Sequence, residues 1–171
     1  MIPPESVIVT ELTISALPPA PLHAVEIWSN PGAFSERCLA VLGVAPPRMG
    51  QSAASDALTL MRYEPTVWLA EGDCGRLEDL LRGDGAITAI GGGIVRVRIA
   101  GAGWRSLLMQ GSFFDAESPA FAPGACAATV IDHVAVRLFV ESAGSCLVYV
   151  PASYAAALIH FWEDVRLLAE S

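Results

Sequence analysis

The feature that most limits how this chain can fold is a long run without any Asp, Glu, Lys or Arg, from Ala143 to Trp162. Its length alone would permit a transmembrane helix. Pro151 divides the run, however, because proline does not continue a helix interior. Before it, Cys146–Val150 is typical of a strand, and from Tyr154 onward the apolar residues have helical spacing. The run therefore predicts a strand followed by a helix, and no membrane span.

Upstream of this run, residues 23–90 show the element order β-α-β-β-α-β. The expected elements are a strand at Ala24–Trp28, a helix from Pro31 to Gly43, strands at Ala57–Tyr63 and Thr66–Glu71, a helix capped by Asp73, and a strand at Ala86–Ile90. Asn30 followed by Pro31 is favoured at a helix N-terminus, and Gly43 at its C-terminus. The two middle strands have the pattern of a hairpin. This order is typical of a ferredoxin-like unit.

Residues 94–168 resemble a second, imperfect copy of the same unit. The expected elements are a strand at Ile94–Ile99, a helix from Gly103 to Gln110, a loop over Gly111–Gly124, strands at Val134–Val140 and Cys146–Val150, and a final helix. Apolar residues at helical spacing give the final helix one stripe that packs on the sheet. We therefore expect a repeat of strand, helix and hairpin in this half.

Together these patterns predict an α+β fold. Two ferredoxin-like half-units of the β-α-β-β-α-β type, residues 23–90 and 94–168, are expected to form one compact domain over residues 23–171. Residues 1–22 are expected to be an N-terminal arm, because several prolines surround a β-like stretch at Val7–Ile14 that suits a sheet edge.

Composition excludes several classes of protein. The formal charge of −8, from 18 acidic and 10 basic residues, repels a phosphate backbone and argues against nucleic-acid binding. Hydrophobic residues make up 53% of the chain and charged residues only 16%, so we expect partner proteins to cover part of the surface. The N-terminus has no basic segment followed by an apolar one, which favours a cytoplasmic location over secretion.

No residue pattern in the chain predicts a catalytic, cofactor-binding or metal site. The three histidines, His23, His133 and His160, are isolated from one another and from any metal-binding motif. The four cysteines lack a Cys-x-x-Cys pair and are interpreted as buried free thiols. Gly101 to Gly103 lacks the third glycine of a dinucleotide fingerprint, and Gly91 to Gly93 lacks the lysine of a phosphate loop.

Aromatic residues are the candidates for contact with a partner. They are Trp104, Phe113, Phe114, Phe121, Tyr154 and Trp162. The loop Gly111–Gly124 is long for a compact unit, and two adjacent phenylalanines within it are suited to fill a pocket on another protein. Core packing is the competing interpretation for each of the six.

Several short motifs occur in an order that resembles a known family. They are Leu58–Leu60 with Val67–Ala70, the strand Val95–Ile99 leading into Gly101, Pro119–Gly124 with Thr129 downstream, and Val150–Ala155 at the start of the last helix. Over about residues 57–168 the chain resembles the gamma subunit of heterotetrameric sarcosine oxidase, which is itself similar to the folate-binding aminomethyltransferase of the glycine cleavage system. It departs from that family at Ala152, where arginine is expected.

The resemblance implies a role without chemistry in this chain. In such a complex the beta subunit holds the flavins FAD and FMN and oxidises an N-methyl amine. The alpha subunit holds NAD and a tetrahydrofolate site, and the delta subunit carries zinc. A gamma subunit holds no redox cofactor and packs against the alpha subunit. Two alternatives stay open: a free-standing folate-binding or one-carbon transfer module, and a ferredoxin-like scaffold or regulatory domain.

Overall fold

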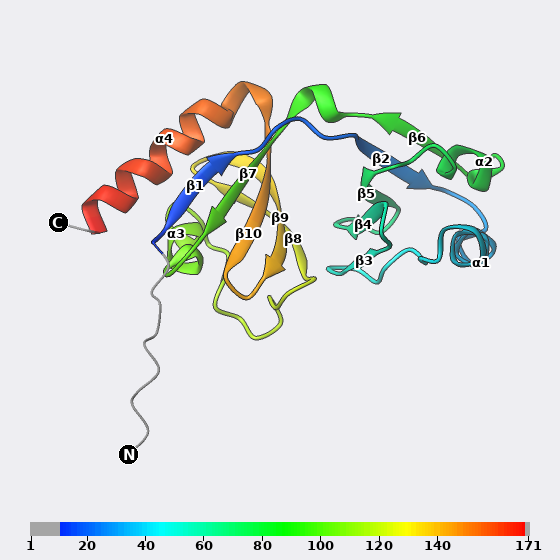
Figure 1. Ribbon diagram of the computed structural model, residues 1–171, viewed down its shortest axis with the longest axis horizontal. Helices are drawn as coiled ribbons and strands as arrows, with labels where there is room; N and C mark the ends of the chain where they lie inside the picture. The colour runs from blue at the N-terminus through cyan, green and yellow to red at the C-terminus, as the bar shows by residue number, and fades with distance from the viewer. Residues whose placement is uncertain (1–10, 170–171) are drawn as a thin grey trace, which may run out of the picture.

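A computed structural model describes residues 11–169 of the chain. Within this range the fold is α+β, as predicted, and contains two five-stranded antiparallel sheets. The sheets stack face to face, and each is covered on its outer face by two helices (Figure 1). The layers therefore follow the order helix, sheet, sheet, helix.

Sheet B, with strand order β3-β4-β5-β2-β6, comes from the first half of the chain. Its strands are β2 (Leu22–Ile27), β3 (Ser52–Ala54), β4 (Leu58–Arg62), β5 (Val67–Gly72) and β6 (Gly85–Ala89), and its helices are α1 (Pro31–Leu42) and α2 (Leu77–Leu81). The predicted succession of elements is present, with β3 as an additional short strand. Asp73 does not cap α2 as expected, because α2 begins after Arg76 and the Asp73 carboxylate accepts a hydrogen bond from the Gly75 amide.

Asp84 connects α1 to the turn before β6. Asn30, at the start of α1, adopts a φ of +45° and donates from its side-chain amide to the Asp84 carboxylate at 2.7 Å. Ser29 donates to the same carboxylate, and Arg37 donates to its second oxygen at 2.9 Å. These hydrogen bonds lower the pKa of Asp84. Asn30 therefore stabilises the helix start through a distant carboxylate rather than by capping an amide of α1.

Sheet A, with strand order β1-β7-β10-β9-β8, comes mainly from the second half. Its strands are β1 (Thr13–Ala16), β7 (Ile94–Ala100), β8 (Cys126–Ile131), β9 (Val134–Ser142) and β10 (Ser145–Pro151), and its helices are α3 (Trp104–Met109) and α4 (Ala152–Ala169). The uncharged run divides into β10 and α4 as predicted. No helix within residues 11–169 is both long enough and apolar enough to cross a membrane.

Strand β8 was not predicted, because its turn lacks the usual sequence signal. Asp132 and His133 join β8 to β9 in a two-residue turn, and their φ angles are +44° and +67°. Such turns usually contain glycine or asparagine at these positions. Because histidine is not a typical residue of such a turn, the sequence gives no signal for this hairpin. Residues 126–131 are therefore absent from the predicted strands.

The N-terminal arm supplies an edge strand to the opposite half of the fold. β1 pairs antiparallel with β7, with Thr13 opposite Ala100, although β2 begins only a few residues later in sheet B. The prediction of an edge strand is confirmed for residues 13 and 14 and is wrong for residues 11 and 12, which precede β1, and residues 7–10 of that prediction lie outside the described range. Gly101 has a φ of +104°, and a Cβ there would clash with the carbonyl oxygen of Glu11. Glycine at this position therefore allows the arm to approach.

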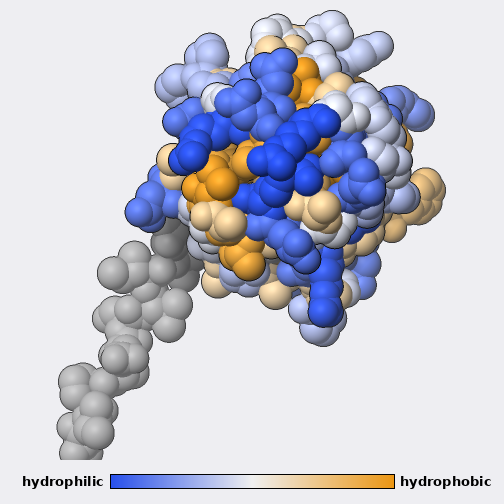
Figure 2. Space-filling model, turned by 90° about the vertical axis from the view of Figure 1, so that its right-hand side faces the viewer, coloured by the Kyte–Doolittle hydropathy of each residue, from blue (hydrophilic) through white to orange (hydrophobic). Residues whose placement is uncertain are grey.

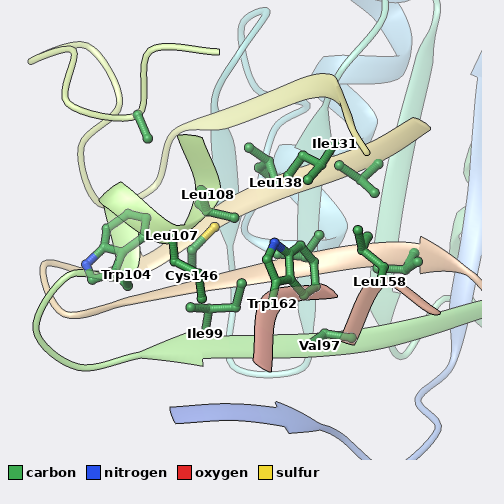
Figure 3. Close-up of a cluster of buried hydrophobic side chains, with 14 of the residues drawn as sticks. Val97, Ile99, Trp104, Leu107, Leu108, Ile131, Leu138, Cys146, Leu158 and Trp162 are labelled. Carbon is green, nitrogen blue, oxygen red and sulfur yellow. The ribbon is translucent and has the colours of Figure 1, made fainter. Parts of the chain in front are cut away.

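Three hydrophobic clusters hold the layers together. One lies between sheet A and helices α3 and α4, and in Figure 3 Trp162 and Leu158 of α4 lie near Val97 and Ile99 of β7. A second lies between sheet B and helices α1 and α2. The third joins the two sheets, and it is smaller: Leu22, Met61, Tyr63, Leu69, Cys126, Leu147 and Tyr149. The sheet-to-sheet contact is thus part of the folded core.

A charged network crosses the same contact between the sheets. Arg96 on β7 donates to Glu71 on β5 at 2.5 Å, and Tyr149 on β10 donates to the other Glu71 oxygen at 2.7 Å. Arg96 also donates to the carbonyl of Pro18 at 2.5 Å. Burial, with the neighbouring Glu71 carboxylate, raises the pKa of Tyr149 and keeps its hydroxyl protonated as a donor. Glu71 therefore connects sheet B to two strands of sheet A and, through Arg96, to the N-terminal arm.

Candidate functional site

The His, Cys, Asp and Glu side chains of residues 11–169 do not gather into a metal centre. In this range, no three His, Cys, Asp or Glu residues are placed to hold a metal ion. His133 lies in the exposed turn between β8 and β9, and His160 on the outer face of α4 lies 3.6 Å from Asp164. His23 lines an open hollow of about 620 Å³ beside Asp73 and Glu78. The three histidines thus lie in separate places.

The four cysteines are free and buried, as predicted from their spacing. Burial raises the pKa of Cys38 and Cys74 from 9.0 to about 11, and that of Cys126 to about 12. The pKa of Cys146 is raised further for the same reason. Because the thiolate is the nucleophile and the metal ligand, these cysteines are held in their unreactive form.

We expect the folded chain to resist a thiol reagent such as DTNB at about pH 8, while all four cysteines react in denaturing urea.

The same pKa shifts predict that the free energy of unfolding falls as the pH rises above 9.0, the ordinary thiol pKa, toward about 11. Unfolded thiols ionise in that window, whereas the folded ones stay protonated. Urea titrations across it measure the fall, and rapid labelling of the folded chain would contradict the prediction.

The two glycine motifs have structural roles. Gly91 to Gly93 form a short 3-10 turn where the chain passes from sheet B to sheet A, and a Cβ on Gly91 would lie 2.9 Å from the carbonyl oxygen of Ala20. Gly103 precedes α3 with a φ of +84°. The first motif therefore forms the crossing between the sheets, and the second forms the start of a short helix.

Three of the six aromatic residues proposed for a partner contact are core residues instead. Trp104, the first residue of α3, and Phe121 are buried beside each other, and the Trp104 indole donates to the Ala143 carbonyl at 3.1 Å. Trp162 is fully buried between α4 and sheet A (Figure 3). The prediction is wrong for these three, because their rings fill the space between helix and sheet and present no surface.

The other three aromatic residues behave differently from one another. Phe113 is fully exposed, with 110% of its reference surface accessible, and Tyr154 on α4 is 54% exposed. Phe114 is half-buried and packs edge-on against Phe121, with ring centroids 4.8 Å apart. Of the adjacent pair, Phe114 therefore points inward and holds the loop, while Phe113 points outward.

Arg105 is the residue that organises this loop, and the sequence reasoning missed it. Its guanidinium lies over the ring of Trp104, 4.3 Å from the centroid. One of its nitrogens donates to the Ala116 carbonyl and another donates to the Phe121 carbonyl at 2.9 Å. The sequence does contain a signal for this role: Arg105 directly follows a tryptophan on a short predicted helix, just before a long loop.

Other exposed apolar residues are dispersed. On the face over α1 and α2, hydrophobic side chains alternate with hydrophilic ones (Figure 2). Leu39 and Val41 on α1 are the large exposed apolar residues of that helix. An apolar groove of about 380 Å³ lies between residues 11–12, just before β1, helix α3 and the end of α4. The loop over residues 111–124 therefore carries one of several exposed apolar side chains. It differs from the other places in that its phenylalanine, Phe113, is fully exposed.

The structure thus defines an α+β chain built from two stacked sheets. No family model and no curated protein sequence matches it. Among solved structures it is similar to a chain of heterotetrameric sarcosine oxidase from Corynebacterium sp. U-96 in complex with pyrrole 2-carboxylate. That match has a TM-score of 0.77 and 17% identity, over 94% of this chain and 86% of that chain.

A second similar structure is the glycine cleavage system aminomethyltransferase T from Bartonella henselae. The TM-score is 0.63 with 17% identity, over 92% of this chain and 47% of that chain, so this chain spans about half of the aminomethyltransferase. At this level of identity the likeness shows a shared fold. The expected resemblance to these two proteins is thus confirmed at the level of the fold.

Proposed function

We propose that this chain is a non-catalytic, gamma-type subunit of a heterotetrameric, flavin-dependent amine oxidoreductase of the sarcosine oxidase type. The observation that carries the proposal is the match to a chain of such a heterotetramer over nearly the full length of both chains. Both chains are therefore of similar size. In this assignment the large alpha subunit packs against this chain, and beta and delta subunits complete the complex in the cytoplasm.

The chemistry of the proposed complex belongs to the partner subunits. FAD, FMN, NAD, tetrahydrofolate and zinc would be held there, and the reaction would be the oxidative demethylation of an N-methyl amino acid coupled to tetrahydrofolate. The cysteine thiols of this chain are held protonated, and within residues 11–169 no set of His, Cys, Asp or Glu is arranged for a metal. Both observations support a role in assembly.

The fold of each half supports the same assignment. We infer that sheet B with α1 and α2 is a ferredoxin-like unit, because the strands flanking its helices have the spatial order β4-β5-β2-β6. Sheet A matches this arrangement if β1 takes the place of the last strand, giving the order β1-β7-β10-β9 with β8 added at the edge. The second half is thus a permuted copy whose final strand comes from the N-terminal arm.

The test is to purify the tagged chain from its own host and to record the absorption spectrum of what is recovered. We expect larger subunits to co-purify, with a flavin spectrum, and the complex to oxidise sarcosine or a related N-methyl amino acid. A chain that is recovered alone as a stable monomer would contradict the proposal.

A free-standing folate-binding or one-carbon transfer module is the second candidate, favoured by the match to the aminomethyltransferase. That match covers only 47% of the enzyme, so about half of its structure has no counterpart here. Calorimetric titration of the isolated chain with tetrahydrofolate separates the two functions. The subunit proposal expects no saturable binding, and the module requires it.

A further inference from the structure

The loop over residues 111–124, here called the aromatic loop, holds its backbone in place with its own contacts. Ser112 lies 3.3 Å from the Thr129 hydroxyl on β8 and accepts a hydrogen bond from the Phe114 amide at 3.0 Å. Phe114 packs on Phe121, and Arg105 holds the carbonyls of Ala116 and Phe121. The backbone on both sides of Phe113 is therefore ordered before any partner arrives, which reduces the entropy lost on binding.

Phe113 itself makes none of these contacts with its ring, which is fully exposed. Burying an exposed apolar ring is favourable, so such a ring on an ordered backbone is suited to be a binding anchor. The neighbouring Phe114 lines a hollow of about 290 Å³ together with Met49, which is 54% exposed.

The charged groups around Phe113 carry negative charge. Asp115 and Glu117 lie on the same loop, and the Asp132 amide donates to Gly111 at its start. Arg105, the nearby cation, is turned inward over Trp104. A second copy of this chain would bring an equally acidic rim against this one, and like charges facing each other oppose association. A basic rim on the partner would complement it.

We propose that Phe113 is the anchor by which this chain docks into an apolar pocket, rimmed by arginine or lysine, on a larger subunit of its complex. The inference rests on the proposed function for the identity of that subunit. Asp115 and Glu117 face the basic rim, so the association weakens as the salt concentration rises. Tyr154, also exposed and aromatic, lies on a separate element, α4.

The test uses the complex purified through a tag on this chain. Phe113→Ala is expected to weaken retention of the larger subunits at least about thirtyfold, which corresponds to the loss of about 2 kcal/mol for an anchor residue. Leu39→Ala, which removes an exposed apolar side chain from α1, is the matched control and should retain them as the natural chain does. Both variants should unfold at the same temperature as the natural chain, since both side chains are exposed.

Photo-crosslinking locates the contact directly. With p-benzoylphenylalanine at position 113, we expect a crosslink to a larger subunit in a peptide that contains apolar residues beside Arg or Lys. Crosslinking to a second copy of this chain, or undiminished retention by Phe113→Ala, would overturn the docking. If the captured partner is a protein without flavin but crosslinks from position 113, the docking stands and the proposed function fails. If the natural chain retains no partner, both fail.

Discussion

Replacing Trp162 by alanine is expected to destabilise the chain by about 3–5 kcal/mol, the range for removing a large buried aromatic side chain. Trp162 is fully buried between α4 and sheet A, where it packs near Val97, Ile99 and Leu158 (Figure 3). Its removal leaves a cavity under the longest helix of the described chain, and the rigid strands on the other side cannot close it. A urea titration followed by circular dichroism measures the loss.

Two comparison variants separate packing from other effects at this position. Trp162→Phe keeps much of the apolar volume and removes the indole N–H, which is buried and has no acceptor among residues 11–169. We expect it to cost less than half as much as alanine. Tyr154→Ala, on the exposed side of the same helix, should change stability by less than about 0.5 kcal/mol. Equal losses from Trp162→Ala and Tyr154→Ala would contradict the role of Trp162 in the core.

Replacing Arg96 by methionine is expected to cost about 2–3 kcal/mol, because one oxygen of the largely buried Glu71 carboxylate and the Pro18 carbonyl lose their hydrogen-bond donor, and among residues 11–169 only the Tyr149 hydroxyl still donates to Glu71. The side chains of Arg96 and Glu71 are 14% and 21% exposed. Methionine preserves the length of the apolar stem, so the loss reports on the ion pair and hydrogen bonds. The measurement is the urea-unfolding free energy of the full chain.

Arg98 is the control for this prediction. It lies on the same strand and forms a two-point ion pair with Glu141, but its side chain is 44% exposed. Exposed ion pairs contribute about 1 kcal/mol or less, so Arg98→Met should be the milder change. In a double-mutant cycle, Arg96→Met and Glu71→Gln should cost less together than the sum of the single variants. Additive costs would show that the two side chains act independently.

Local sequence patterns were sufficient where one element determines its own limits. Asn30, Pro31 and Gly43 mark the ends of α1, and Pro151 divides β10 from α4, as the structure has them. Pairing between distant segments was harder to predict. β8 was missed because its turn contains Asp132 and His133. The pairing partner of β1 could not be predicted, because the sequence of an edge strand does not indicate which strand it pairs with.

For the candidate surface, the sequence could identify aromatic residues but not the direction of each ring. Phe113 and Phe114 are adjacent and chemically identical, yet one is fully exposed and the other packs on Phe121. The difference depends on Arg105 and on the Ser112 contact with β8, which join segments that only the fold brings together. Trp104, Phe121 and Trp162 were overestimated as surface residues for the same reason.

The pairing of β1 with β7 also sets an order of events on the ribosome. The strands of sheet B, residues 22–89, can associate as soon as they emerge, whereas Thr13–Ala16 has no partner until Ala100 has been synthesised. Strand β1 is therefore placed only after the later strand β7 has been made, and closing so long a loop is slow. A nascent chain that stalls before β7 exposes an unpaired strand beside a finished sheet, which is a substrate for chaperones or for aggregation.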